Sequence, residues 1–186
     1  MTTAPAPHLR VRDLTITHDG ESRPAVAGAS FDVAPGEVVL VLGPSGAGKS
    51  TLALALNGLL PQSIPGEVTG TITYDAVAVA RTPVARLSTI VGMVFQDPDA
   101  QVVTATLLDE VAFGPENLCL PVAEVLARSE AALREVGLLE RRQDDPDRLS
   151  GGGRQRLAIA CALDLRSPVP LLAVMNSNIS PPDPRE

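Results

Sequence analysis

The sequence has very little lysine. Lys49 is the only lysine in 186 residues, and every other basic side chain is arginine. Basic residues are also outnumbered, because 15 lysine and arginine residues face 22 acidic ones, which gives a net charge of -7. A protein that binds nucleic acid through a broad basic surface needs the opposite balance. We therefore expect no nucleic-acid partner.

Cysteine and long apolar runs are scarce as well. The sequence has two cysteines, Cys119 and Cys161, and their separation matches none of the spacings typical of metal sites. We expect both to be reduced thiols in a cytosolic protein. No apolar run approaches the roughly 20 residues that span a bilayer, and residues 1–7 lack the pattern of a signal peptide. The length predicts one domain with a core of its own.

Lys49 lies in a glycine-rich stretch between two apolar runs. The stretch consists of Gly43, Pro44, Ser45, Gly46, Ala47, Gly48, Lys49, Ser50 and Thr51. Residues 38–42 predict a strand buried on both faces, and residues 52–60 predict a helix. In this context, the pattern G-x-x-x-x-G-K-[ST] indicates a phosphate-binding loop. The alternative, an ordinary strand-to-helix turn rich in glycine, rarely carries the pattern in this context.

The residue types in this stretch suit the phosphates of a nucleotide. Glycines allow backbone N–H groups to wrap a phosphate, and the helix N-terminus that follows carries a partial positive charge. Lys49 is expected to reach the β- and γ-phosphates, and the Ser50 hydroxyl is expected to bind Mg²⁺.

The rest of the chain predicts an α/β fold. Further strands are expected at 9–16, 30–33, 69–74 and 90–95, and further helices at 84–87, 106–113 and 154–165. Turns are expected at 18–20 and at 35–36. Pro121 opens another helix, which Gly137 ends. The buried face of that helix is predicted to comprise Val122, Val125, Leu126, Ser129, Leu133 and Val136.

A second glycine-rich stretch, residues 149–153, precedes the helix at 154–165. Ser150 is expected to cap that helix, and the glycines leave its N-terminus open to an anion. The alternative is a plain glycine loop before a helix.

Three stretches together resemble the nucleotide-binding domain of an ABC transporter. Residues 43–50 resemble the Walker A motif, Val94–Gln96 resembles the Q-loop, and Leu149–Arg156 resembles the ABC signature. The resemblance implies a P-loop NTPase core with a RecA-like parallel sheet, an N-terminal antiparallel sheet and an inserted helical subdomain. The core would comprise residues 1–96 and 149–186, and the helical subdomain residues 97–148.

The resemblance also implies roles for individual residues. In this family, two ATP-binding subunits sandwich two ATP molecules, and Ser150, Gly151 and Gly152 of one subunit contact the γ-phosphate held by the other. Gln96 would help to place Mg²⁺, together with Ser50, and would position the attacking water. His18 lies where the family usually has an aromatic residue that stacks on adenine.

A narrower resemblance concerns the residues around the Q-loop. Residues 95–101 and Phe113–Asn117 are similar to the ATPase subunits of energy-coupling factor importers, which take up vitamins or transition-metal ions. This resemblance implies a membrane-embedded transporter subunit as a partner, besides a second ATP-binding subunit of the same or a sister chain. It places the protein at the cytoplasmic face of the membrane.

The last residues depart from the family pattern. Counting back along the family pattern from Asp183 and Pro184 implies a strand at 171–175 and puts Asn176 and Ser177 at the positions of the usual Asp-Glu pair. Asparagine lacks the charge that holds the Mg²⁺ shell, and serine is not a useful base at neutral pH, so hydrolysis is expected to be impaired. The family's switch histidine and last strands are missing, which is expected of a truncated gene or of an inactive subunit.

Two other functions are alternatives to a transport ATPase. A non-hydrolysing nucleotide-binding or regulatory subunit would fit Asn176 and Ser177. A soluble P-loop kinase or GTPase would leave residues 149–156 without a role.

Overall fold

The computed structural model describes residues 9–94 and 102–172. The chain divides into two compact units, of which the first holds the described residues 9–91 and the second holds residues 92–94 and 102–172. None of the described helices is long and apolar enough to cross a membrane.

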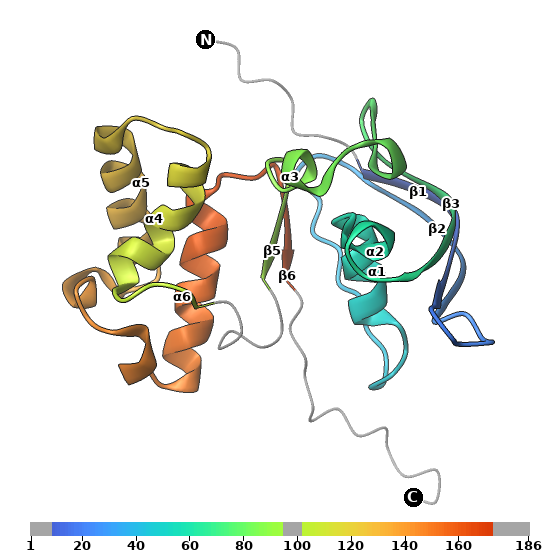
Figure 1. Cartoon of the computed structure of the whole chain (residues 1–186), viewed down its shortest axis with the longest axis horizontal. Coiled ribbons are helices and arrows are strands. Elements are labelled where there is room, and N and C mark those ends of the chain that lie inside the picture. The colour runs from blue at the N-terminus through green and yellow to red at the C-terminus, as the bar shows by residue number, and fades with distance from the viewer. Residues whose placement is uncertain (1–8, 95–101, 173–186) are drawn as a thin grey trace, which may run out of the picture. The chain divides into compact units, whose positions relative to one another are not determined.

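The first unit is built on a four-stranded antiparallel sheet in the order β2-β1-β3-β4. Strands β1, β2 and β3 are labelled in Figure 1. Its strands are β1 (Leu9–His18), β2 (Val26–Val33), β3 (Gly66–Tyr74) and β4 (Val77–Ala78). The strand predicted at 69–74 is therefore an inner strand along its last residues, where it pairs with β4. A bulge interrupts β1 at Asp13, which has a φ of 47° and donates its backbone N–H to the Ser30 hydroxyl at 2.8 Å.

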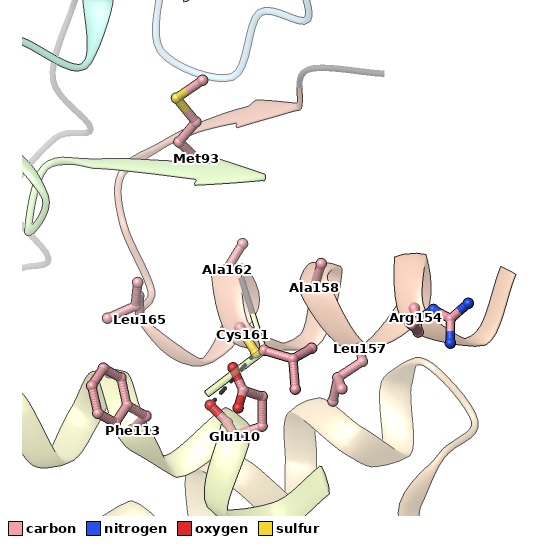
Figure 2. A pocket seen from close by; sticks show the side chains of 11 residues that line it. Met93, Glu110, Phe113, Arg154, Leu157, Ala158, Cys161, Ala162 and Leu165 are labelled. Carbon is pink, nitrogen blue, oxygen red and sulfur yellow. Dashed lines mark hydrogen bonds between the residues drawn. The ribbon is translucent and has the colours of Figure 1, made fainter. Parts of the chain in front are cut away.

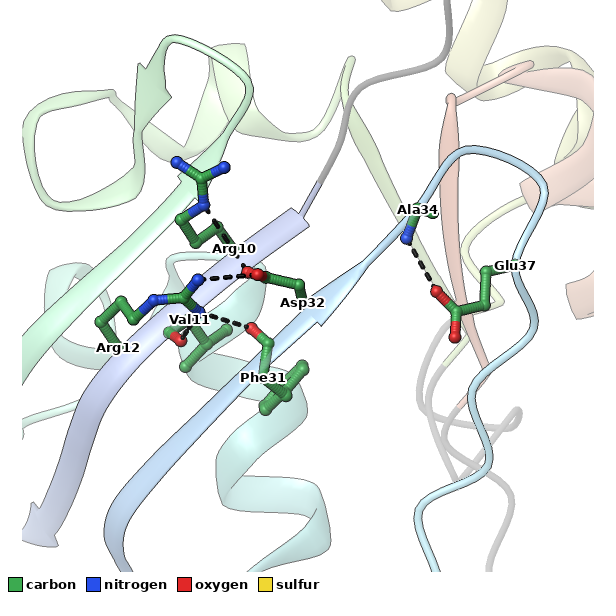
Figure 3. Close-up of polar contacts among 7 residues, drawn as sticks. All are labelled: Arg10, Val11, Arg12, Phe31, Asp32, Ala34 and Glu37. Atoms are coloured by element: carbon green, nitrogen blue, oxygen red, sulfur yellow. Dashed lines mark hydrogen bonds and ion pairs between the residues drawn. The ribbon is translucent and has the colours of Figure 1, made fainter.

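Polar contacts on the exposed side of the sheet tie β1 to β2 (Figure 3). The Arg12 guanidinium donates to the Asp32 carboxylate at 2.7 Å and to the Phe31 carbonyl at 3.2 Å. Directly after β2, the Ala34 N–H donates to the Glu37 carboxylate at 2.8 Å, and the Glu37 N–H donates back to the Ala34 carbonyl at 3.1 Å. This closed turn confirms the turn predicted at 35–36.

Short helices complete the first unit. They are α1 (Lys49–Leu56), α2 (Leu59–Gln62), the 3-10 helix η1 (Val79–Arg81) and α3 (Val84–Leu87). The helix predicted at 52–60 ends earlier, because Gly58 takes a φ of 82°. Leu52, Ala55 and Leu56 of α1 are buried, and the Tyr74 hydroxyl of β3 donates to the Leu56 carbonyl at 2.9 Å.

The strand predicted at 38–42 is absent, and this prediction is wrong. Residues 38–42 form neither helix nor strand, and Val38, Leu40 and Leu42 are 94%, 76% and 71% exposed. A central strand of a parallel sheet needs partners on both edges and cover on both faces. No described strand pairs with this segment. The sheets of the described chain are therefore the antiparallel sheet of the first unit and a two-stranded sheet in the second.

The second unit packs three helices against one another. These are α4 (Leu107–Asn117), α5 (Val122–Glu135) and α6 (Gly151–Asp164), with 3-10 helices η3 (Leu139–Arg141) and η4 (Pro146–Arg148) between the last two. Strands β5 (Val91–Val94) and β6 (Val169–Leu172) form the two-stranded sheet. The core between the helices consists of Leu107, Val111, Ala132, Leu133, Leu138, Leu149, Leu157 and Ala160. The extent of the helical subdomain, residues 97–148, stays a prediction.

The buried face of α5 differs from the predicted one. Val125, Ser129 and Leu133 are buried as predicted, but Val122 is 74% exposed and Leu126 is 46% exposed. Ala132 is buried in their place. The face that turns inward is the one that meets α4 and α6, and a small residue fits that contact.

Candidate functional site

The glycine-rich loop lies against the turn between β1 and β2. Gly48 has a φ of 85°, and a Cβ added there would come within 2.2 Å of the Ala25 carbonyl oxygen. Gly46 has a φ of 79°. Side chains rarely adopt this backbone conformation, and at Gly48 none would fit. The sequence pattern of glycines therefore has a physical reason in this structure, since it allows the backbone to turn tightly into α1.

The N-terminus of α1 suits an anion. Its cap residue, Gly48, has no side chain to bind the first N–H groups, which belong to Lys49, Ser50 and Thr51, and α1 has no acidic residue in its first turn. These N–H groups and the helix dipole favour a phosphate at this end.

The ammonium group of Lys49 folds back over the loop. Its Nζ donates to the Gly43 carbonyl at 2.8 Å and to the Pro44 carbonyl at 2.7 Å. An ammonium has three donors, so these two bonds hold the loop while a third donor can serve an anion. Loop, helix end and cation thus fit the phosphates of a nucleotide.

His18 contacts the same helix. Its Nε2 lies 2.9 Å from the Thr51 hydroxyl, and Thr51 is 8% exposed. The sequence predicted both residues as nucleotide-binding, but not the bond between them, which joins positions 33 residues apart.

The second predicted anion site lies at the N-terminus of α6. The Ser150 hydroxyl accepts from the Gly153 N–H at 3.3 Å, which confirms the predicted cap. A Cβ added at Gly151 or Gly152 would meet nothing within 4 Å, whereas one at Gly153 would come within 3.1 Å of the Leu149 Cβ. Packing within the described chain thus explains the third glycine and not the first two.

Glu110 of α4 was not predicted from the sequence. It is 8% exposed, and its Oε2 accepts from the Val103 N–H at 3.0 Å, the Thr104 N–H at 2.9 Å and the Thr104 hydroxyl at 2.8 Å. The carboxylate thereby holds the segment that leads into α4. Thr106, whose hydroxyl accepts from the Asp109 N–H at 3.1 Å, caps the helix itself. The signal by which Glu110 could have been found in the sequence is that it is an acidic residue in the first turn of a helix.

A partly open cavity of about 180 Å³ lies beside α4 and α6 (Figure 2). Its walls are largely apolar and include Met93, Phe113, Leu157 and Ala162. Cys161 also lines it, and burial raises the pKa of this thiol to about 12, with the nearby Glu110 and Asp164 adding to the effect. The Cys161 thiol is therefore protonated at neutral pH and unsuited to be a nucleophile.

A second buried carboxylate lies at the end of α6. Asp164 is 2% exposed, and its Oδ2 accepts from the Ser129 hydroxyl at 2.7 Å. Burial raises the pKa of Asp164, while the Ser129 bond and the nearby Arg128 and Arg166 oppose that shift. Its Oδ1 has no hydrogen-bond partner within the described chain.

The three predicted catalytic positions, Gln96, Asn176 and Ser177, lie outside the described residues. Among residues 9–94 and 102–172, no cluster of three or more histidine, cysteine or acidic side chains could hold a metal ion. A Mg²⁺ ion bound with a nucleotide needs few protein ligands, because phosphates and water supply most of its oxygens. The exposed Ser50 hydroxyl at the first turn of α1 suits such a site.

Comparison with known proteins finds ABC transporter ATP-binding proteins in each case. The family model described as ABC transporter matches residues 26–172. The chain is 40% identical over 176 residues to a putative ABC transporter ATP-binding protein of Methanosarcina acetivorans, over 95% of this chain and 27% of that protein. It is also 40% identical over 174 residues to the energy-coupling factor transporter ATP-binding protein EcfA1 of Lacticaseibacillus paracasei, over 93% of this chain and 60% of that protein.

A solved structure shares the fold. The cbiO1 protein of Clostridium perfringens, described as part of the ABC transporter complex cbiONQ, matches with a TM-score of 0.74 and 32% identity. The match covers 88% of this chain and 64% of that one. The chain spans between 27% and 34% of the length of three of the curated relatives that it matches.

Proposed function

Because the chain belongs to the ABC transporter family of ATP-binding domains, we propose that it binds ATP at residues 43–51 and couples that binding to transport. The observation that carries this proposal is the geometry of the loop. Gly48 has no room for a side chain, the N-terminus of α1 has no side-chain cap and no acidic residue in its first turn, and the only lysine folds over the loop.

A second ATP-binding subunit is part of the proposal. Gly151 and Gly152 are exposed at the start of α6, and packing within the described chain does not require a glycine at either position. A glycine also serves where another molecule approaches the backbone closely. We assign that approach to the nucleotide on a partner subunit, with Ser150, Gly151 and Gly152 as its contacts. The partner is a second copy of this chain or a sister ATPase.

The transporter class that we propose is an energy-coupling factor importer for a vitamin or a transition-metal ion. Two similarities support it, since EcfA1 is named as the ATP-binding protein of an energy-coupling factor transporter and cbiO1 as part of the cbiONQ complex. In such an assembly the protein lies at the cytoplasmic face of the membrane, against a membrane-embedded subunit.

The surface proposed for the membrane subunit is the exposed side of α4. Phe113 is 49% exposed there, beside the cavity shown in Figure 2, and Glu116 is exposed on the same helix. A large apolar side chain at such a position suits the apolar face of a partner helix.

Mg²⁺ and hydrolysis complete the proposal. Ser50 and Gln96 are the proposed Mg²⁺ ligands, and Gln96 also orients the attacking water. Asn176 and Ser177 support an alternative in which this chain binds ATP and does not hydrolyse it, because neither side chain is a base at neutral pH.

The test of ATP binding is a titration of the Lys49→Ala variant. A charge-assisted hydrogen bond contributes roughly 1.5–3 kcal/mol, so we expect the affinity for ATP to fall at least about tenfold. Calorimetric titration measures this loss. Arg86→Ala, which removes an exposed positive charge from the same unit, is the matched control and should leave the affinity unchanged.

A second measurement uses the lysine content of the chain. Lys49 is the only lysine, so an amine reagent can modify one side chain besides the amino terminus. Saturating ATP should protect Lys49 from the reagent. Equal affinity of Lys49→Ala and the wild type, or equal modification with and without ATP, would remove the proposed site.

A further inference from the structure

We propose that His18 is a positioning residue for the phosphate-binding loop, and that it acts through the Thr51 hydroxyl. This inference rests on the proposed function, because it needs a phosphate at the N-terminus of α1. It assigns His18 a role beyond the stacking on adenine that its position in the sequence predicts.

The first observation is that Thr51 has a buried hydroxyl at the anion-binding end of a helix. Thr51 is the third residue of α1 and is 8% exposed. Side chains of a helix point back toward its N-terminus, so this hydroxyl lies on the side of the loop. A buried hydroxyl needs a hydrogen-bond partner, and the His18 imidazole supplies one at 2.9 Å.

The second observation is that His18 is held in place by its backbone. Its carbonyl accepts from the Glu21 N–H at 3.0 Å, which closes the turn after β1. In the sheet, His18 pairs with Gly66 of β3. The two strands are close at this point, since a Cβ added at Gly66 would come within 2.9 Å of the Thr17 carbonyl oxygen. The ring therefore projects from a fixed point of the sheet, and Thr51 is tied to that point.

The chemistry of the bond shows what it does. A hydroxyl has one proton to donate and can accept from other donors. When the imidazole donates its Nε2–H to the Thr51 oxygen, the hydroxyl proton remains for a phosphate oxygen. A bound phosphate favours this arrangement, because it leaves each group with a partner. His18 thus aligns Thr51 as a donor and holds the first turn of α1 against the sheet.

The test separates this role from stacking on a base. Inorganic tripolyphosphate has no base, so a ring that acts only by stacking cannot affect its affinity. We expect His18→Phe, which keeps an aromatic ring and loses the hydrogen bond, to weaken the binding of tripolyphosphate and of ATP by similar factors of about tenfold. Thr51→Val should do the same, and Thr51→Ser, which keeps the hydroxyl, should lose much less affinity than Thr51→Val.

A double variant tests whether the two residues act together. If they share one interaction, His18→Phe with Thr51→Val should bind tripolyphosphate no more weakly than either single variant. Thermal unfolding of each variant shows whether it is folded, and a purely structural role would lower the unfolding temperature without this coupling in affinity.

The outcomes distinguish the inference from the function on which it rests. Loss of ATP affinity with unchanged tripolyphosphate affinity in His18→Phe would leave only stacking and overturn the inference. Additive losses in the double variant would overturn it as well. If the wild type binds neither ligand, or if Lys49→Ala binds both normally, the proposed site itself is wrong and the inference falls with it.

Discussion

At the scale of single residues, the buried carboxylate of Asp164 makes the stability of the chain depend on pH. Burial raises its pKa above the ordinary value of 3.8, so the folded chain keeps this proton to a higher pH than the unfolded chain does. The stability that the neutral form contributes is complete below 3.8 and is lost as the pH rises through the raised pKa. Above that raised pKa, a charged and incompletely bonded group is buried.

Asp164→Asn should stabilise the protein at pH values above the raised pKa of Asp164. Asparagine keeps an acceptor for the Ser129 hydroxyl and removes the charge. We expect a gain of about 1 kcal/mol, or roughly 2–4 °C in the unfolding temperature. The gain should disappear as the pH falls toward 3.8, where the wild-type carboxyl group is neutral. Thermal unfolding at a series of pH values measures it, and Asp19→Asn, at an exposed turn, is the control. A gain that does not change with pH would show that the charge of Asp164 has no such cost.

At the scale of elements, the Glu110 carboxylate of α4 holds the preceding segment, Val103 and Thr104, by hydrogen bonds. Glu110 accepts three hydrogen bonds from Val103 and Thr104, and it does so beside the helix N-terminus, where a negative charge is favoured. The segment and the helix should therefore behave as one unit.

Glu110→Ala should cost roughly 3 kcal/mol in the free energy of unfolding, because it removes the charged acceptor of three partly buried hydrogen bonds. Glu110→Gln keeps one acceptor without the charge and should cost less. Urea unfolding measures both, and the exposed Glu116→Ala on the same helix should change stability by less than about 0.5 kcal/mol. Hydrogen exchange gives a local readout, since the amides of Val103 and Thr104 should exchange faster in Glu110→Ala. Unchanged exchange at these two amides would contradict the role of Glu110.

At the scale of the whole molecule, residues 38–42 place an apolar, strand-forming run in solvent. Val38 and Leu40 are 94% and 76% exposed. Exposed apolar segments with high strand propensity promote pairing between chains. We therefore expect the isolated chain to associate as its concentration rises.

Replacing Val38 and Leu40 by threonine should reduce this association and leave the free energy of unfolding within about 0.5 kcal/mol of the wild type. Threonine is β-branched and has a high strand propensity, so it keeps the conformational preference of the segment while it removes apolar surface. Light scattering follows association, and urea unfolding follows stability. The comparison variant is Leu52→Thr in the core, which is 9% exposed and should cost several kcal/mol. If the double variant is as unstable as Leu52→Thr, the run is buried, as the sequence predicted.

The sequence by itself determined the features that depend on a few neighbouring residues. The turn at 35–36, the cap at Ser150 and the helix end at Gly137 formed where they were predicted, because a hydrogen bond or a positive φ within a few residues decides each of them. The tight turn of the glycine-rich loop belongs to this class, since its positive φ angles and the Lys49 bonds lie within one short stretch. That this loop binds phosphate stays a prediction. The helix at 84–87 was also predicted with the observed bounds.

Only the tertiary structure decided the features that depend on distant residues. The His18–Thr51 bond joins β1 to α1, and Ser129 meets Asp164 across 35 residues. The apolar pattern of α5 could not show that Ala132 is buried and Val122 exposed, because the buried face is determined by the contacts of α5 with α4 and α6. An apolar run such as 38–42 becomes a buried strand only where other strands pair with it. Local rules act through bonds within a turn of the chain, whereas pairing and burial need a partner that no short stretch of sequence contains.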